Sequence, residues 1–346
     1  MTEPDVTQEG RTGRSGRPHP AVAAIRYAVR THIADLAERV GRDDGLVLVA
    51  CSGGADSLAL AEAVAFECRH GAWSGGAVIV DHGLQPGSGE AASEAAETCR
   101  SLGLDPVEVV RVSVSRAGRG LEAAAREARH EALTETGRRL GAVAVLLGHT
   151  LDDQAEQVLL GLTRGSGTRS LGGMPARRGL MERPLLGITR EQTREACAAE
   201  GLQVWDDPMN ADPEFTRVRA RRAVADLERE LGPGVASALA RSADQLRADA
   251  DLLDALAGDA RRGLGPGPDH DVATFAAIPA PLRTRVWRVL LLEAGAPAGR
   301  TGAAHTDACD RLLTHWRGQG PLHLPGDLRV ARRGTRVRVE RPGPVE

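Results

Sequence analysis

The stretch Val47-Leu-Val-Ala-Cys-Ser52-Gly-Gly-Ala-Asp56-Ser57-Leu-Ala-Leu-Ala-Glu62 decides the fold of this chain. Its apolar run stops at Ser52, two glycines permit a tight turn, and an apolar helical pattern follows Ser57. This order predicts a strand, a loop and a helix N-terminus. Free N–H groups and the positive end of the helix dipole meet in such a loop, so it can bind phosphate without a cationic side chain. The alternative is an ordinary helix start capped by Asp56 or Ser57.

The residues of this loop distinguish between classes of nucleotide site. Kinases and GTPases place a lysine in their P-loop, whereas this chain contains no lysine and all 44 of its basic residues are arginine. The sequence Ser52-Gly-Gly-Ala-Asp56-Ser57 instead resembles the loop of the PP-loop ATP pyrophosphatases. That resemblance implies ATP bound by its pyrophosphate and cleaved to AMP, with a cradle formed by Ser52, Gly53, Gly54, Ala55, Asp56 and Ser57.

Composition predicts a multidomain cytoplasmic enzyme. With 346 residues, two or more domains are expected. A net charge of −3 gives no global basic field, so any RNA binding must be local. Five cysteines without a Cys-X-X-Cys pair favour reduced, mostly structural thiols and offer no zinc or iron–sulfur ligand set. We expect no membrane span, and both a monomer and a homodimer remain open.

Alternating patterns predict an α/β domain with a doubly wound parallel sheet. The resemblance to the PP-loop proteins implies that this sheet is of the adenine-nucleotide-hydrolase-like type. Apolar runs and helical patterns take turns at 46–50, 57–70, 77–80, 88–102, 107–112, 121–140, 143–147 and 152–163. Ligands bind such sheets at the carboxyl ends of the strands. The loop at Ser52, the pair Asp81 and His82, and His149 each follow a strand, so we expect them to share one crevice, with Asp81 and His82 near the nucleotide.

The remainder of the chain reads differently. Helical patterns at 189–200, 216–231, 234–262, 280–294 and 304–316 precede a C-terminal stretch whose alternation and Gly turns predict small β-hairpins. We therefore expect a disordered tail at 1–20, a PP-loop ATP-binding catalytic domain at 21–230, and a helical plus small β region at 231–346.

A second chemical cluster lies in Gly148-His149-Thr-Leu-Asp152-Asp153-Gln154-Ala-Glu156. On a helix, Asp153 and Glu156 share a face, as do His149 and Asp153 if the helix begins early enough. Two carboxylates facing the phosphate loop can hold Mg²⁺, or bind an ammonium group and remove its proton. Asp56 beside phosphate is repulsive unless a cation intervenes, so Asp56 and Asp153 are the candidate Mg²⁺ ligands. The alternative is an acidic first turn that complements the helix dipole.

The string from His149 to Gly167 resembles the second signature of the tRNA(Ile)-lysidine synthetases. The segments Val80–Leu84, Leu121–His130, Arg183–Leu186, Trp205–Asn210 and Phe215–Arg221 resemble further motifs of that family, in the same order. The match covers about 46–230, roughly half the chain. It departs from the family pattern at the edges of motifs, which leaves the hydrogen bonding of those loops open; the departures are His130, Met209 and Val218.

The resemblance implies an ATP-dependent carbon–nitrogen ligase. ATP adenylates the C2 oxygen of the wobble cytidine in the CAU anticodon of an isoleucine tRNA, and free lysine displaces AMP. Asp56 and Asp153 then meet Mg²⁺ or lysine, and Glu156 meets the lysine ammonium. His149 orients the base or, alternatively, is a capping or core histidine. Two arginines neutralise the departing pyrophosphate. One of them is Arg126 or Arg129, and the other is Arg217 or Arg221.

Two arginine clusters are candidates for tRNA phosphate contacts, with a solvated face as the alternative. They are Arg217, Arg219, Arg221 and Arg222, and Arg329, Arg332, Arg333, Arg336 and Arg338. With 2% aromatic residues, a flipped base has few rings to stack on. Two other functions stay open: a PP-loop tRNA thiolase, which needs catalytic cysteines or an iron–sulfur cluster, and a non-catalytic nucleotide- or RNA-binding protein, which does not need carboxylates beside phosphate.

Overall fold

The computed structural model describes residues 17–83, 87–113, 121–164, 167–207, 209 and 212–341. Two compact units divide the chain, the first comprising 1–159 and 174–240 and the second 160–173 and 241–346. The first unit therefore extends beyond the expected boundary at 230/231, and the segment 160–173 belongs to the second. The reason lies in the second unit itself: Arg169 on this segment pairs with Asp251 at 2.5 Å, on helix α9 (Val235–Gly263).

The first unit contains a six-stranded sheet in the order β3-β2-β1-β4-β6-β5. All neighbouring pairs are parallel except β5 and β6, so the predicted parallel sheet is confirmed with one short antiparallel edge. The four longer strands coincide with the predicted apolar runs. The bounds are β1 Gly45–Ala50, β2 Trp73–Asp81, β3 Val107–Arg111, β4 Ala144–Leu147, β5 Arg177–Arg178 and β6 Met181–Glu182.

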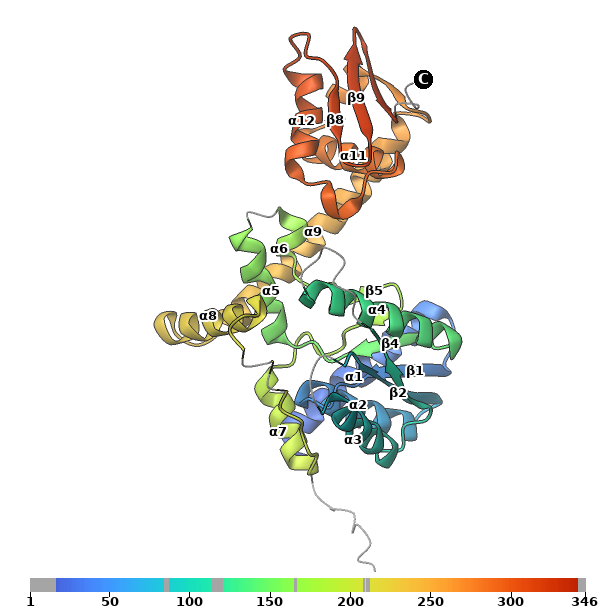
Figure 1. Cartoon of the computed structure of the whole chain (residues 1–346), viewed down its shortest axis with the longest axis vertical. Coiled ribbons are helices and arrows are strands. Elements are labelled where there is room, and N and C mark those ends of the chain that lie inside the picture. The colour runs from blue at the N-terminus through green and yellow to red at the C-terminus, as the bar shows by residue number, and fades with distance from the viewer. Residues whose placement is uncertain are drawn as a thin grey trace, which may run out of the picture. The chain divides into compact units, whose positions relative to one another are not determined.

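Helices cover both faces of this sheet, as a doubly wound fold requires (Figure 1). Val47 and Val49 of β1 pack in one buried cluster with α1 (Pro20–Val40), α2 (Ala55–Arg69), α3 (Ser88–Ser101) and α7 (Arg190–Glu200). Leu48 and Ala50, which alternate with them, pack in a second cluster with Leu133 of α4 (Leu121–Arg139). The chain order reverses between β1 and β4, and the carboxyl ends at such a point form a ligand crevice.

Helix α1 was not predicted as an element. Its buried residues Val22, Ile25 and Val29 follow a helical period, and Pro20 and Gly41 are ordinary start and stop residues. Alanine and arginine between these positions weaken the apolar contrast of the pattern. Of the expected disordered tail, residues 1–16 lie outside the described residues.

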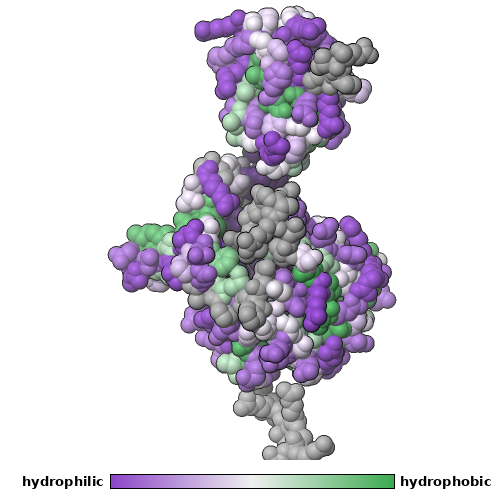
Figure 2. Space-filling view, viewed as in Figure 1, coloured by the Kyte–Doolittle hydropathy of each residue, from purple (hydrophilic) through white to green (hydrophobic). Residues whose placement is uncertain are grey.

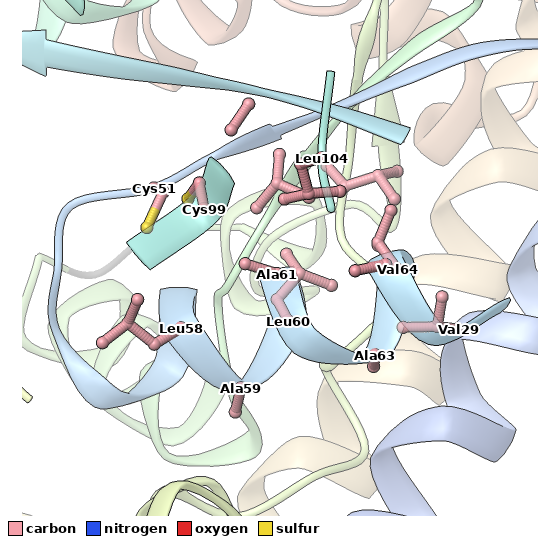
Figure 3. Packing of buried hydrophobic residues seen from close by; sticks show 14 of the residues in the cluster. Val29, Cys51, Leu58, Ala59, Leu60, Ala61, Ala63, Val64, Cys99 and Leu104 are labelled. Carbon is pink, nitrogen blue, oxygen red and sulfur yellow. The ribbon is translucent and has the colours of Figure 1, made fainter. Parts of the chain in front are cut away.

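Helix α2 packs its apolar side tightly beneath the sheet (Figure 3). Leu60 and Val64 are completely buried, which stabilises the fold by roughly 1.5–3 kcal/mol for each side chain. Cys51 and Cys99 lie side by side in the same cluster, and all five cysteines are free thiols. This packing fixes the start of α2 directly below the phosphate loop.

The second unit is helical with a small antiparallel sheet in the order β7-β10-β9-β8. The predicted hairpins are β8–β9 and β9–β10, and Phe275 stacks on Trp287 in the core with ring centroids 4.5 Å apart. The elements of this region and the remaining helices are α5 Leu151–Thr163, α6 Thr168–Leu171, α8 Thr216–Leu231, β7 Asp269–Asp271, α10 Val272–Ala276, α11 Ala280–Glu293, η2 Ala298–Arg300, α12 Ala303–Thr314, β8 Leu322–Leu324, β9 Leu328–Arg333 and β10 Arg336–Glu340.

The visible surface is mostly hydrophilic, with apolar colour confined to small areas (Figure 2). Among the described residues, none of the helices combines the length and apolar character needed to cross a bilayer.

Candidate active site

A cavity of about 410 Å³ opens at the carboxyl ends of β1 and β4 in the first unit. Ala50 and Leu147, the last residues of these strands, form part of its wall, and His82 reaches it from the end of β2. The sequence-predicted residues that line it are Ser52, Gly54, Ala55, Asp56, Ser57, His82, Arg129, His149, Asp153, Arg217 and Arg221. Residues from distant segments thus meet in the crevice that the strand pattern predicted.

The phosphate loop is held in shape by its own side chains. Ser57 Oγ accepts the Ser52 N–H at 3.0 Å and donates to the Gly54 carbonyl at 2.9 Å. Gly53 has φ of +81°, which a residue with a Cβ rarely adopts, and its carbonyl accepts from Trp205 N at 3.0 Å. The hydroxyl of Ser57 is therefore committed to the loop itself, although Ser57 also lines the cavity.

The start of α2 leaves donors for an anion. The helix begins at Ala55, one residue after Gly54, and no side chain caps it, so the alternative of capping by Asp56 or Ser57 is wrong. Within the described part of the chain, no acceptor takes up the N–H groups of Gly54, Ala55 and Asp56. These donors and the helix dipole fit a phosphate group.

Two guanidinium groups line the same cavity without an ion pair to any residue that the structure describes. Arg129 on α4 and Arg217 on α8 line it, and neither forms a hydrogen bond or ion pair with another described residue. Burial and the nearby Arg217 lower the pKa of Arg129. Arg126, the other member of the first pair, is exposed and lies outside the cavity lining. Of this pair, Arg129 is therefore placed to meet a phosphate.

Three carboxylates gather around one arginine that the sequence analysis missed. Arg190 at the start of α7 lies 2.8 Å from Asp153 Oδ1, 3.2 Å from Glu156 Oε1 and 3.7 Å from Asp56 Oδ2. Burial raises the pKa of Asp56, whereas Asp153, which is also buried, has a lowered pKa because the Arg190 guanidinium and the Thr150 N–H stabilise its charged form. The predicted convergence of Asp56 and Asp153 thus exists, with a guanidinium between them.

Glu156 is 2% exposed and lies outside the cavity lining, behind Arg190 and Arg221, which do line it. Its Oε1 accepts from Arg190 and from Arg221 Nε at 2.9 Å, and its Oε2 is buried without a hydrogen-bond partner in the structure. A buried carboxylate oxygen without a donor is costly, so it is poised for a further cation or proton donor.

His149 is not on the helix that bears the carboxylates. Helix α5 begins at Leu151, so the early helix start under which His149 and Asp153 would share a face does not occur. The N–H of Thr150 donates to Asp153 Oδ2 at 2.8 Å. One oxygen of Asp153 therefore stabilises the start of α5, in agreement with the alternative of an acidic first turn. Burial lowers the pKa of His149 to about 3, which leaves a neutral ring whose Nδ1 is buried without a partner.

The low pKa of His149 predicts a loss of stability in acid. Between about pH 3 and its ordinary pKa of 6.5, the unfolded chain binds more protons than the folded chain, so the free energy of unfolding falls as the pH falls through this window. His149→Gln should therefore lose less thermal stability than wild type between pH 7 and pH 4.5. Thermal unfolding midpoints over this range measure the effect, and parallel curves for both chains would contradict it.

Other sequence-predicted residues have different surroundings. Asp81 lies outside the cavity lining, where it accepts from Gly83 N at 3.0 Å and Ser88 Oγ at 2.8 Å. The Gly83 hydrogen bond is the main reason that its pKa is lowered. His82 does line the cavity, and its Nδ1 is buried without a partner.

The cavity also contains residues to which the sequence analysis gave no role. Trp205 and Phe215 line it, so two of the few aromatic rings in the chain are available for stacking there. Arg194, one turn after Arg190 on α7, lines it as well. Met209 and Val218, which depart from the family pattern at the edges of motifs, also line the cavity.

Comparisons with known proteins agree with this geometry. A PP-loop domain matches residues 26–228, and a TilS substrate binding domain matches 271–337. The tRNA(Ile)-lysidine synthase of Streptomyces coelicolor is 50% identical over 346 residues, covering 92% of this chain and 98% of the relative. The enzymes with this name from Thermobifida fusca and Salinispora tropica are 52% and 51% identical, covering 92% and 94% of this chain and 96% and 98% of the relatives.

The chain belongs to the tRNA(Ile)-lysidine synthase family. Membership makes it an ATP-dependent ligase built on a PP-loop domain. A solved U34-tRNA thiolase, NcsA from Methanococcus maripaludis, which contains an iron–sulfur cluster, has a TM-score of 0.55 and 18% identity, covering 66% of this chain and 80% of its own. At that identity, the likeness shows the fold alone. The thiolase alternative is therefore less well supported than the ligase.

Proposed function

We propose that this chain uses ATP to join free lysine to the wobble cytidine of an isoleucine tRNA with a CAU anticodon, in the cytoplasm. One observation carries the proposal: an anion cradle, Asp56 and Asp153 line a single cavity, and a third carboxylate, Glu156, pairs with the lining residues Arg190 and Arg221. The reaction needs both the cradle and the carboxylates, because it first moves a nucleotide phosphate and then activates an amine.

The cradle suits the triphosphate of ATP. Free N–H groups at Gly54, Ala55 and Asp56 would contact the phosphates, and Arg129 and Arg217 would balance the charge that develops as pyrophosphate leaves. Mg²⁺ is usually bound by one or two carboxylates together with phosphate oxygens. Asp56 and Asp153 can supply those carboxylate ligands. When bound, the ion would neutralise charge on the departing pyrophosphate.

The two chemical steps balance without any further reactant. The C2 oxygen of cytidine bonds to the α-phosphorus of ATP while the bond to pyrophosphate breaks. The lysine amine then bonds to C2, and AMP leaves with the former C2 oxygen. Glu156 is the candidate to hold the ammonium and take its proton, since its Oε2 has no partner in the structure.

The base would lie against the aromatic and imidazole groups of the cavity. Trp205 or Phe215 offers a ring for stacking, and the neutral His149 can donate or accept one hydrogen bond. This assignment keeps the orienting role that the sequence analysis gave to His149.

The C-terminal arginines do not form one equivalent set. Arg332 donates to the carbonyls of Leu312 at 2.9 Å and Leu313 at 3.2 Å, and its guanidinium lies 4.7 Å from the ring centroid of Trp316. It therefore stabilises the end of α12. The side chain of Arg333 is exposed and forms no ion pair or hydrogen bond with another described residue. Arg333 is therefore the better candidate for a tRNA phosphate contact.

Arg333→Glu should weaken tRNA binding by about three- to tenfold and reduce the slope of its salt dependence by about one ion. The physical reason is the loss of one phosphate contact and its counterion release. Filter binding at several salt concentrations measures both quantities, and Arg332→Gln should instead lower the unfolding midpoint. If affinity and slope stay at wild-type values for Arg333→Glu, this face is only solvated.

Incorporation of labelled lysine tests the proposed function. We expect ATP-dependent transfer of label to an isoleucine tRNA transcript with a CAU anticodon, and none when the wobble cytidine is replaced by uridine. Failure to label the CAU transcript would contradict the proposal.

A further inference from the structure

Arg190 occupies the position that the proposed function reserves for substrate cations. Its guanidinium contacts the carboxylates of Asp56, Asp153 and Glu156 at once, and its side chain is only 15% exposed. An incoming ammonium held by Asp153 and Glu156, even at the unpartnered Oε2 of Glu156, would lie close to this guanidinium. Two unit cations a few ångströms apart repel each other in a poorly hydrated site. The amine and Arg190 therefore compete for the carboxylates of Asp153 and Glu156.

The start of α7 does not depend on the guanidinium of Arg190. Thr189 and Gln192 form a capping box, and the backbone N–H of Arg190 donates to Asp152 Oδ2 at 2.8 Å. Thr193 Oγ1 donates to Asp56, and Cys197 Sγ donates to the Ala55 carbonyl at 3.3 Å. These contacts anchor the helix beside the phosphate loop. The Arg190 side chain can consequently change partner while its backbone stays in place.

The phosphates of ATP are the nearest alternative anion. Arg190 lines the same cavity as Ser52 and Gly54 and already reaches Asp56 of the phosphate loop. A triphosphate in that cradle brings several negative charges within reach of a long side chain, and a guanidinium binds phosphate oxygens with two parallel hydrogen bonds.

We propose that Arg190 sets the order of binding by occupying the amine position in the ligand-free chain and transferring to phosphate when ATP binds. Its departure frees Glu156 for the amine and Asp153 for the amine or Mg²⁺, so lysine binds tightly only to the nucleotide complex. The inference rests on the proposed function for the identity of the amine. It assigns Arg190 a positioning role, because Arg190 acts on the nucleophile through the carboxylates.

The test is the coupling between nucleotide and lysine in the full chain. Lysine binding is measured by equilibrium dialysis with and without Mg²⁺ and α,β-methylene-ATP, whose α–β bridge resists cleavage. Wild type should bind lysine at least about tenfold more tightly with the nucleotide. Arg190→Gln should bind lysine without nucleotide more tightly than wild type does, and its coupling should fall below about twofold. Arg190→Lys keeps a cation and should retain part of the coupling.

Two controls separate this role from a structural one. Arg30 forms a two-bond pair with Glu67 outside the cavity, so Arg30→Gln should keep the wild-type coupling. Unfolding midpoints and nucleotide affinity show whether Arg190→Gln is folded. The proposal would be overturned if the lysine affinity of wild type did not change with nucleotide. It would also be overturned if Arg190→Gln kept the coupling, or if it bound lysine more weakly than wild type both with and without nucleotide. Failure of the proposed function is a separate result, in which wild type transfers no lysine to tRNA.

Discussion

Gly54→Val should lower ATP-dependent turnover at least about 100-fold while the chain still folds. Gly54 has an ordinary φ of −76°, and an added Cβ would meet only Ser52 Oγ at 3.7 Å and the Trp205 carbonyl at 4.0 Å. The ligand-free protein can therefore accept the side chain. A phosphate that approaches the backbone at this point cannot, because the Cβ and its methyl groups occupy the space the phosphate needs. Pyrophosphate release and ATP affinity measure the effect.

Gly299→Val is the matched control for this substitution. Gly299 also has no positive φ, no atom lies within 4 Å of its added Cβ, and it lies in the second unit. It should keep ATP affinity and the unfolding midpoint close to wild type. An unchanged ATP affinity in Gly54→Val would contradict the assignment of phosphate binding to this loop.

Glu156→Gln should separate the two chemical steps. The amide keeps the shape of the side chain and an acceptor for Arg221, but it loses the charge that holds an ammonium and the basicity that removes its proton. Lysine transfer should fall by about 100-fold or more, whereas pyrophosphate release should fall only a few-fold. The adenylated tRNA should accumulate, since the nucleophile no longer arrives in its reactive form.

Both steps are measured on the same samples, by pyrophosphate release and by lysine incorporation. Asp56→Asn is the comparison, and it should slow pyrophosphate release as well, because Asp56 lies in the phosphate loop and is a candidate Mg²⁺ ligand. An equal loss of both steps in Glu156→Gln would assign Glu156 to the metal or to the fold instead of to lysine.

The sequence predicted the sheet well because its strands are short apolar runs with clear breaks. Cys51 and Ser52 end the first run, and an apolar helix follows, so the crevice and most of its residues could be placed without coordinates. Helix α1 escaped prediction because its apolar residues are separated by alanines and charged residues. The first residue of α5 could not be predicted either, because it depends on capping contacts such as that of Thr150 with Asp153.

The role of Arg190 could not be read from the sequence. It lies 134 positions after Asp56 and 37 after Asp153, in a chain where arginine is the only strongly basic residue type and abundant on every surface. Only the packing of α7 against α2 brings it to the carboxylates. The motifs of Arg126 and Asp81 fit the family, but the sequence could not show that their side chains lie outside the cavity lining.

The route of one oxygen atom tests the central claim most directly. A CAU tRNA carrying ¹⁸O at the C2 position of its wobble cytidine is incubated with the enzyme, ATP and lysine. The masses of the AMP and of the modified cytidine are then measured by mass spectrometry. If the cavity adenylates C2 and an amine then displaces the nucleotide, the AMP must carry the ¹⁸O and the modified cytidine must lack it. AMP without the label, or a modified cytidine that retains it, would contradict the account.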